Sequence, residues 1–427
     1  MASAGKLPIR ALLVFWLFLL STVAYLDRTN ISIAGLQISH EYGLNNVKLG
    51  WLASVFLIGY AASQVPAGWL AVRFGPRKIL TFGLMWWGVF TALTAVVPTS
   101  SGQALIFLIA FRFLLGVGES MMYPASSQLV ARWIPLRERG LANGWIFAGV
   151  GTGAGLTPPL LAWIIGHYGW RASFWFSALV GVVAGAMWYL IARDTPEEHP
   201  LVTQAELKTI EEGTNKEVES SVDNAPLEWG RLFRSKAMCA LTLSYFAYGY
   251  VAWIFFAWFY IYLQQERHLD VKSSAVYSMF PFLAMTVFSA LGGLANDWIT
   301  NRYGARAGRC GIGVVALAVT SGLLWFGPAV KDAHVASLIL AGGAGILYFS
   351  QSSYWSVVVD LAGRRSGISG GLMNMGAQVG GAMTASLTPW IAKSFGWNAS
   401  FRVSAILALL GAILWLLVDP QEKIFEA

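Results

Sequence analysis

The sequence predicts an all-α membrane protein with twelve transmembrane helices, arranged as two six-helix halves related by a parallel repeat. Three observations lead to this fold class. Of the 427 residues, 56% are hydrophobic and only 12% are charged, whereas soluble domains usually carry about 25% charged residues. Apolar stretches near or above the roughly 20 residues needed to cross a hydrocarbon core recur along the whole chain. Finally, part of the first half of the sequence returns in the second half.

The apolar stretches divide the chain into twelve predicted spans. The first span follows Lys6 and Arg10, as the core of a secretory signal also does. Its apolar pattern continues past Asn30, however, and no small-residue cleavage site follows, so we interpret it as a retained helix. The predicted spans cover residues 11–36, 49–72, 79–98, 103–130, 140–165, 170–193, 237–263, 273–298, 310–330, 335–359, 367–393 and 398–418.

Lysine and arginine residues in the short loops predict the orientation. Because cytoplasmic loops are enriched in these residues, the side that carries more of them is expected to be cytoplasmic, with both termini on it. We therefore expect a multi-pass protein of the inner membrane, and the net charge of +7 reflects topology and not nucleic-acid binding. The eleven residues on the first side are Arg73, Arg77, Lys78, Arg132, Arg137, Arg139, Arg302, Arg306, Arg309, Arg364 and Arg365, and the six on the other are Lys48, Arg171, Arg267, Lys272, Lys331 and Lys393.

A polar segment separates six spans from six. Residues 194–236 hold ten of the 22 acidic residues and few large apolar ones, which predicts a solvated cytoplasmic linker with a short surface helix around 203–218. The predicted units are therefore an N-terminal half at 1–193, the linker at 194–236 and a C-terminal half at 237–427.

The two halves are related in sequence. The hexapeptide GWRASF at 169–174 returns as GWNASF at 396–401, which is 227 residues later. With this offset, residues 140–174 and 367–401 share 13 identities in 35 positions, five of them glycines. An equal division into related halves of the same orientation is the parallel-repeat organisation of many secondary transporters.

Several motifs resemble those of a known transporter group. The loop GWLAVRFGPRK after the second span, echoed by GGLANDWITNR after the eighth, resembles the loop motif of the major facilitator superfamily. The stretches YLDRTNIS, FRFLLGVGESMMYPA, RWIPLRERGLANG and GGLMNMGAQVGG are similar to those of its anion:cation symporter family, whose bacterial members carry sugar acids and other organic carboxylates. The resemblance implies the major facilitator fold and transport of an organic anion.

Two positions depart from the pattern of that family. Val72 stands where the loop motif normally has an acidic residue, whereas the second copy keeps Asp297. A charge lock on the inward-closed state is therefore expected to be weaker in the first half. Val150 and Gly151 occupy the middle of the fifth span, where sugar-acid carriers tend to place a glutamine. This second departure leaves the particular substrate open.

Four charged residues lie well inside the predicted spans. They are Asp27, Arg28, Arg112 and Glu119, all in the first half. A charge at mid-membrane costs at least about 2.5–3.5 kcal/mol, so such residues face the bundle interior and either form ion pairs or have a role in function. Arg112 and Glu119 are seven residues apart, which puts them on one helix face about 10 Å apart. A supporting ion pair of Arg112 with Asp27 is one interpretation, and proton handling by the carboxylates is the other.

The corresponding regions of the second half carry uncharged polar and aromatic residues instead. An asymmetric site is therefore expected, with charge handling on one wall and recognition of hydroxyl or amide groups on the other. From this wall we select Gln351, Tyr354 and Asn374 as substrate-binding residues. Other motifs have simpler interpretations: the glycines of GVGTGAG at 149–155 fit close helix packing and not a phosphate loop. All five histidines fall in predicted loops, so carboxylates are expected to carry any proton.

The family resemblance implies roles for the residues that match its motifs. Tyr25, Arg28, Tyr60 and Asn374 match positions that contact substrate in the family, and Asp27 and Glu119 match its proton-coupling carboxylates.

We therefore expect a proton-coupled symporter that imports an organic anion, such as a hexonate, a hexuronate, an aldarate or another carboxylate, by alternating access. An exchanger or antiporter, or a transporter-like sensor that binds without accumulating, remains the alternative. No nucleophile–base or metal constellation predicts an enzyme. We expect no metal and no cofactor apart from protons as the coupling ion, and a monomer surrounded by membrane lipid.

Overall fold

The computed structural model describes residues 8–44, 46–99, 103–213 and 229–425, and every regular element in these ranges is helical. The first half comprises α1 (Ile9–Tyr42), α2 (Asn46–Phe74), α3 (Pro76–Ala95), α4 (Ala104–Glu119), α5 (Met122–Trp133), α6 (Arg139–Tyr168) and α7 (Trp170–Ile191). The second half comprises α11 (Lys236–Ala257), α12 (Phe259–Gln265), α13 (Val271–Tyr303), α14 (Ile312–Phe326), α15 (Ala333–Phe349), α16 (Gln351–Ala362), α17 (Ser366–Phe395) and α18 (Trp397–Trp415). Between them lie α8 (Gln204–Gly213) and α10 (Trp229–Arg234).

The predicted twelve-helix membrane fold is confirmed. Ten segments of the described chain are long and apolar enough to cross a membrane, and some of these join two helices, as α4 with α5 and α15 with α16. The other two spans are α6 and α17, each of 30 residues. Their glycine, threonine and proline residues dilute the hydropathy of the sequence, but 30 residues of helix extend about 45 Å, which is ample for a bilayer.

Two of the spans are interrupted near their middle. The fourth predicted span breaks between Glu119, the last residue of α4, and Met122, the first residue of α5. The tenth breaks at Ser350, between α15 and α16, so that Gln351 begins a new helix. Broken helices at membrane depth are tolerated where they line a site inside the protein. The interruptions therefore place Glu119 and Gln351 at helix ends in the interior of the bundle.

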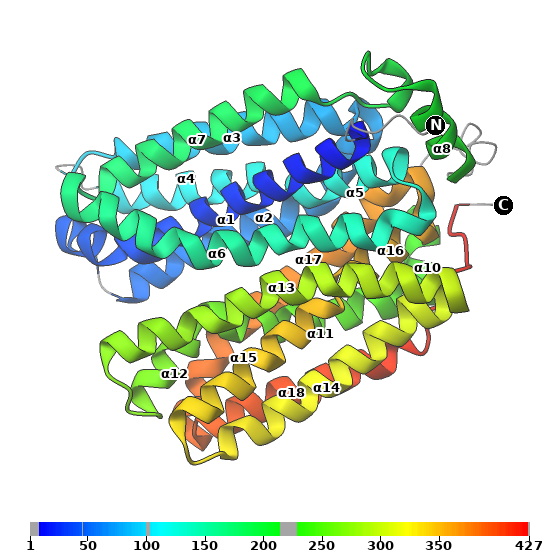
Figure 1. Cartoon of the computed structure of the whole chain (residues 1–427). Helices are drawn as coiled ribbons and strands as arrows, with labels where there is room; N and C mark the ends of the chain where they lie inside the picture. Colours follow the sequence, from blue (N-terminus) through cyan, green and yellow to red (C-terminus); the bar gives the residue numbers. More distant parts are fainter. Residues whose placement is uncertain (1–7, 45, 100–102, 214–228, 426–427) are drawn as a thin grey trace.

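The two halves face each other along a long interface (Figure 1). Across it, α6 packs against α13 and α16, and α2 packs against α17, which also contacts α5. Glycines permit this close approach: a methyl group at Gly68 of α2 would overlap the backbone carbonyl of Gly367 at the start of α17. Both chain ends lie at one end of the bundle (Figure 1), which we call the terminus end.

The linker contacts the first helix at the terminus end. The predicted surface helix is present as α8, and the remainder of its predicted range lies outside the described residues. The buried carboxylate of Glu206 accepts hydrogen bonds from the backbone amides of Ile9 and Arg10, at 3.1 and 3.0 Å. A carboxylate satisfies the free N–H groups of a helix start and favours its dipole, so α8 braces the start of α1.

The helices run further than the predicted spans at several ends. Consequently, the expectation that all five histidines lie in loops is wrong for three of them. His40 and His167 lie in the last turns of α1 and α6, and His334 lies in the first turn of α15. These turns lie at helix ends, away from the interrupted middles of the spans.

Candidate functional site

The charged residues of the first half meet inside the bundle. The guanidinium Nε of Arg28 on α1 donates a hydrogen bond of 2.6 Å to Oε2 of Glu119, at the end of α4. Arg28 is 8% exposed and Glu119 is completely buried. Ion pairs in such surroundings are held strongly, because removing one partner leaves a buried charge at a cost of about 3–5 kcal/mol.

Aromatic rings surround the Arg28 guanidinium. Its central carbon lies 4.8 Å from the ring centre of Tyr25, 5.7 Å from that of Phe56 and 4.5 Å from that of Tyr60. Such contacts with the faces of rings stabilise a cation, more so where water is excluded. The rings therefore hold the guanidinium in place without neutralising its charge.

The ion pair leaves hydrogen-bonding capacity unused. Among the described residues, Nη2 of Arg28 and Oε1 of Glu119 have no hydrogen-bond partner, although both are buried. A guanidinium and a carboxylate can form two parallel bonds, but this pair forms one. Arg28 thus retains a donor for a second oxyanion while it is still bound to Glu119.

Asp27 and Arg112 lie near this pair without joining it. Oδ2 of Asp27 accepts a 2.8 Å hydrogen bond from the hydroxyl of Thr91 on α3, and Oδ1 has no partner in the described part of the chain. The expected ion pair of Arg112 is not formed among the described residues: its Nε and Nη1 have no partner, and its guanidinium lies 4.9 Å from the ring of Phe56. Arg112 still interacts electrostatically with Asp27 and Glu119. Helical spacing correctly predicted that Arg112 and Glu119 lie in the same region. It could not predict which ion pairs form there, because pairing depends on how neighbouring helices are rotated.

Asn374 and Tyr60 meet across the two halves, as expected of residues of one site. The side-chain amide of Asn374 on α17 donates to Oε1 of Gln64 at 3.1 Å and to the hydroxyl of Tyr60 at 3.5 Å. Gln64 was missed by the sequence analysis. It follows Tyr60 by four residues, which is one helical turn and the same face of α2, and this spacing was a usable signal.

The predicted polar wall of the second half is only partly where it was expected. Gln351 donates to the hydroxyl oxygen of Tyr245 on α11 at 2.6 Å. Tyr354, by contrast, points away from the charged cluster: its hydroxyl bonds to Ser244 at 2.7 Å, and its ring packs against Trp415 of α18 at 4.7 Å. The structure therefore brings the Tyr354 hydroxyl to Ser244 and not to the Arg28–Glu119 pair, while its ring packs against Tyr245 with centres 4.7 Å apart. Its contact with substrate stays a prediction. Tyr245 was missed because no sequence motif marks it.

An aromatic cluster joins the two halves next to this wall. The ring of Tyr123 on α5 stacks on Phe147 of α6 with centres 4.8 Å apart, and Phe147 lies 5.3 Å from the ring of Trp355 on α16. The hydroxyl of Tyr123 hydrogen-bonds with that of Ser21 at 3.0 Å, two turns before Arg28 on α1. In this part of α6, Val150 is buried, and a side chain at Gly151 would collide with Thr286 of α13. Hence α6 presents hydrocarbon and ring surface here.

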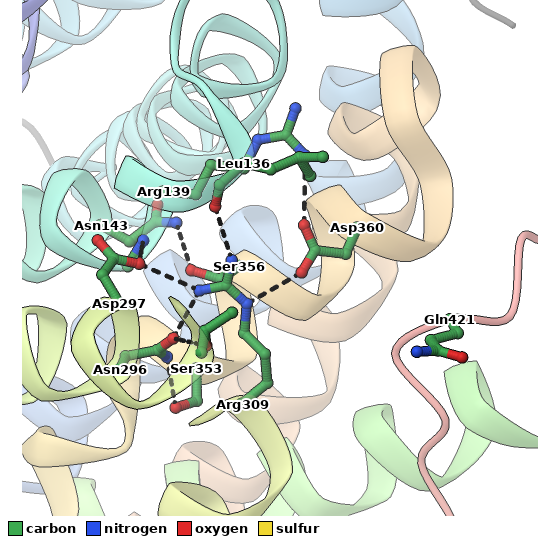
Figure 2. Close-up of polar contacts among 12 residues, drawn as sticks. Leu136, Arg139, Asn143, Asn296, Asp297, Arg309, Ser353, Ser356, Asp360 and Gln421 are labelled. Carbon is green, nitrogen blue, oxygen red and sulfur yellow. Dashed lines mark hydrogen bonds and ion pairs between the residues drawn. The ribbon is translucent and has the colours of Figure 1, made fainter. Parts of the chain in front are cut away.

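A second polar cluster holds the halves together at the terminus end (Figure 2). Asp297 of α13 accepts hydrogen bonds from the backbone amides of Gly140 and Leu141, at the start of α6, at 2.8 and 2.6 Å. Arg309 pairs with Asp360 of α16 at 2.9 Å and with Asp297 at 3.4 Å. It also donates to the carbonyl of Leu136, in the first half, at 2.9 Å. We call these residues, with Arg139, the lock.

Asp360 forms an ion pair with one arginine from each half. Arg139 of the first half donates to Oδ1 of Asp360 at 3.3 Å, while Arg309 of the second half holds Oδ2. Because Arg139 and Asp360 belong to different halves, any separation at the terminus end must break this pair. All of these side chains are buried, so their electrostatic contacts are little screened by salt.

The contact that the sequence repeat relates to that of Asp297 joins the first half to the start of α17, and it carries no charge. At the start of α17, the backbone amide of Gly367 donates to Oε1 of Gln128 at 3.3 Å. Val72 of α2 offers no side-chain acceptor, and its carbonyl accepts a long bond of 3.5 Å from Arg132. The lock is therefore asymmetric, with a carboxylate at the start of α6 and a neutral amide at the start of α17.

Two six-helix halves that enclose charged residues between them form the architecture of secondary transporters. The chain belongs to the Major Facilitator Superfamily, whose sequence model matches residues 17–385, and it is a multi-pass membrane protein.

Three similar proteins illustrate the relationship. The chain is 32% identical over 419 residues to the probable sulfoacetate transporter SauU of Cupriavidus necator, covering 97% of this chain and 95% of that protein. It is 27% identical over 440 residues to the probable galactarate/D-glucarate transporter GudP of Bacillus subtilis, with 98% and 95% covered. The solved structure of the proton:xylose symporter XylE bound to 6-bromo-6-deoxy-D-glucose has a TM-score of 0.76 at 13% identity, over 97% of this chain and 98% of that one. At this identity the last similarity concerns the fold alone.

Proposed function

We propose that the protein imports an organic anion together with protons by alternating access. The observation that carries this proposal is the buried Arg28–Glu119 pair, which forms one 2.6 Å bond and leaves Nη2 and Oε1 unpartnered. Relatives that are named as transporters of sulfoacetate and of galactarate or D-glucarate support an anionic substrate.

Binding of the anion and binding of the proton are proposed to be linked through Arg28. A substrate carboxylate or sulfonate and the ionised Glu119 compete for the same guanidinium. Protonation of Glu119 removes the competing charge, so Arg28 becomes available to the substrate. When Glu119 releases its proton on the other side of the membrane, its carboxylate takes Arg28 back and the substrate is expelled. By thermodynamic reciprocity, the substrate then favours proton uptake to the same degree.

The remaining site residues are assigned by their positions. Tyr25 and Tyr60 hold the Arg28 guanidinium between their rings, and Asn374 and Gln351 offer amides from the second half. Asp27 is proposed as a second proton-binding carboxylate, because one of its oxygens has no partner among the described residues.

The cycle is proposed to run in the inner membrane, with both termini in the cytoplasm. The excess of Lys and Arg in the loops at the terminus end supports this orientation. In the structure the lock joins the halves at that end, so the conformation described here would be closed toward the cytoplasm. We further propose that the monomer transports without a metal or an organic cofactor.

The test separates coupling from binding. Glu119→Gln imitates the protonated residue, so it should retain anion binding and exchange of labelled for unlabelled anion. It should lose the accumulation that a proton gradient drives in liposomes. Glu41→Gln is the matched control, because Glu41 also pairs with an arginine, Arg171 at 2.7 Å, but Glu41 lies outside the candidate spans and the pair is partly exposed. Accumulation by Glu119→Gln at the rate of the control would contradict the proposal.

The same preparation decides between the alternatives. If the unmodified protein exchanges anions but does not accumulate them with an imposed proton gradient, it is an exchanger. If it binds anions without moving them in either assay, it is a sensor.

A further inference from the structure

Three side chains of the second half form a small hydrogen-bonded group. Gln351 Nε2 donates to the hydroxyl oxygen of Tyr245 at 2.6 Å, and Trp355 Nε1 donates to the same oxygen at 3.0 Å. Gln351, Trp355 and Tyr245 are 2%, 1% and 3% exposed. Oε1 of Gln351 is buried and has no partner in the described part of the chain. We call these residues the donor trio, because their N–H groups share the Tyr245 oxygen as an acceptor and its own O–H group is left over.

The count of donors follows from the chemistry of the three groups. The oxygen of Tyr245 already accepts two hydrogen bonds, so its own O–H group is left without an acceptor among the described residues. Rotating the amide of Gln351 by half a turn would let Tyr245 donate to it, but would then remove the Nε2 donor from the hydroxyl oxygen. In either orientation one donor of the trio is left over, and the indole N–H of Trp355 fixes the position of the hydroxyl.

The donor trio and Arg28 belong to opposite walls of one region. Trp355 packs against Tyr123 of the first half with ring centres 5.9 Å apart, and the hydroxyl of Tyr123 hydrogen-bonds with that of Ser21 at 3.0 Å, two turns before Arg28 on α1. Tyr25, on the same helix as Ser21 and one turn further along, has its ring 4.8 Å from the Arg28 guanidinium. A ligand held by Arg28 on the first half is therefore faced by a hydrogen-bond donor on the second.

We propose that the donor trio binds a second acidic group of the substrate, at the end opposite the group that Arg28 holds. The preferred substrate is then a two-headed acid, either a dicarboxylate or a sulfocarboxylate, and not a monoacid. This inference rests on the proposed function and narrows its substrate class. A leftover donor selects an acceptor, and hydrogen bonds to a charged acceptor are roughly twice as strong as neutral ones.

The charges of the site agree with this assignment. Asp27, Arg28, Arg112 and Glu119 sum to zero when all four are ionised. Protonation of both carboxylates gives a net charge of +2, which a doubly charged anion balances. A buried site is least costly when its charges are compensated, so uptake of two protons fits a substrate with two negative charges.

The test uses pairs of acids that differ in one acidic group. Binding of succinate is compared with butyrate, sulfoacetate with acetate, and galactarate with galactonate, by calorimetry on the purified full-length protein. The unmodified protein should prefer the two-headed member of at least one pair by about tenfold or more, as expected for one hydrogen bond to a charged group. Because Tyr245→Phe alone would free the N–H groups of Gln351 and Trp355 that donate to the hydroxyl oxygen, it is combined with Gln351→Leu and Trp355→Phe. This triple variant has no donor left in the trio and should lose most of the preference.

Tyr354→Phe is the matched control. It removes a hydroxyl from a tyrosine of the same half that bonds to Ser244 and faces the interior, so it should keep the preference. Equal affinity of the unmodified protein for both members of every pair that it binds would overturn the inference, and so would an equal loss of both members in the triple variant. These outcomes leave the proposed function standing. If the unmodified protein binds no acid of the panel, the proposed function fails together with the inference.

Discussion

Asp297→Asn is expected to open the bundle at the terminus end. The carboxylate of Asp297 accepts two backbone hydrogen bonds from the start of α6, at 2.8 and 2.6 Å, and pairs with Arg309 at 3.4 Å. Asparagine has the same shape, but one of its two terminal atoms is an N–H donor. One backbone amide of α6 therefore loses its acceptor and faces another donor.

The size of the effect follows from these contacts. A hydrogen bond to a charged group contributes about 1.5–3 kcal/mol, and an unpaired buried donor costs a comparable amount. Because the contact joins the two halves, its loss destabilises the closed state relative to a state in which the terminus end is open. Taking 1.5–3 kcal/mol as the difference, the ratio of closed to open molecules should fall by a factor of about 10 to 150.

Distance measurements between two spin labels provide the assay. Cysteines replace Arg137 and Asn301, which are exposed in the two halves at the terminus end, in a background without Cys239 and Cys310. Asp332→Asn is the control, since Asp332 also accepts a backbone hydrogen bond at a helix start, from Val335 at 2.8 Å, but within one half. Asp297→Asn should add a longer distance that the control lacks. Identical distance distributions in both variants would refute the reasoning.

Two further predictions concern the charged site and the linker. Arg28→Gln should weaken binding of an organic anion by about 30-fold or more, measured by calorimetry. It should also lower thermal stability, because Glu119 is left buried without its partner; combining it with Glu119→Gln should restore the stability but not the binding. Unchanged affinity in Arg28→Gln would exclude Arg28 as the anion contact. Burial lowers the pKa of His199 below its ordinary value of 6.5, whereas the bond to the carbonyl of Ile191 opposes this change. The unfolded linker therefore binds a proton more readily than the folded one, so the stability of residues 194–202 is complete above about pH 6.5 and declines as the pH falls below it. Hydrogen exchange of this segment, corrected for the intrinsic rate, should rise in that range, and constant protection would contradict the assignment.

The positions of the spans were predictable from the sequence because hydropathy and length determine them. The helix interruptions after Glu119 and at Ser350 were not predictable from the sequence. In both cases the interrupted segment is apolar enough overall to form one candidate span, Ala104–Trp133 and Ala333–Ala362, so the hydropathy pattern continues through the break. Only the fold reveals that Glu119 ends one helix and Gln351 begins another.

The candidate site was predictable in part, for a related physical reason. Charged residues within spans are rare and costly, so Asp27, Arg28 and Glu119 could be selected from the sequence alone. Uncharged residues carry no such signal. Tyr245 and Tyr354 are chemically alike and both belong to the second half, yet one faces Gln351 and the other Ser244. Which of them faces the site depends on the rotation of α11 and α16, which sequence patterns do not determine.

The helix α6 connects the lock to the site, and this connection has a consequence for release. Its first amides bind Asp297, and Phe147, seven residues or about 10 Å further along the helix, packs against Trp355. Opening the terminus end must therefore move Phe147 away from Trp355. Trp355 and Tyr245 belong to the same half and can remain bonded, while Arg28 moves with the other half. A two-headed acid held by Arg28 at one end and by the donor trio at the other would then lose one of its two contacts as the halves separate, so the movement that exposes the site also weakens its hold on the substrate.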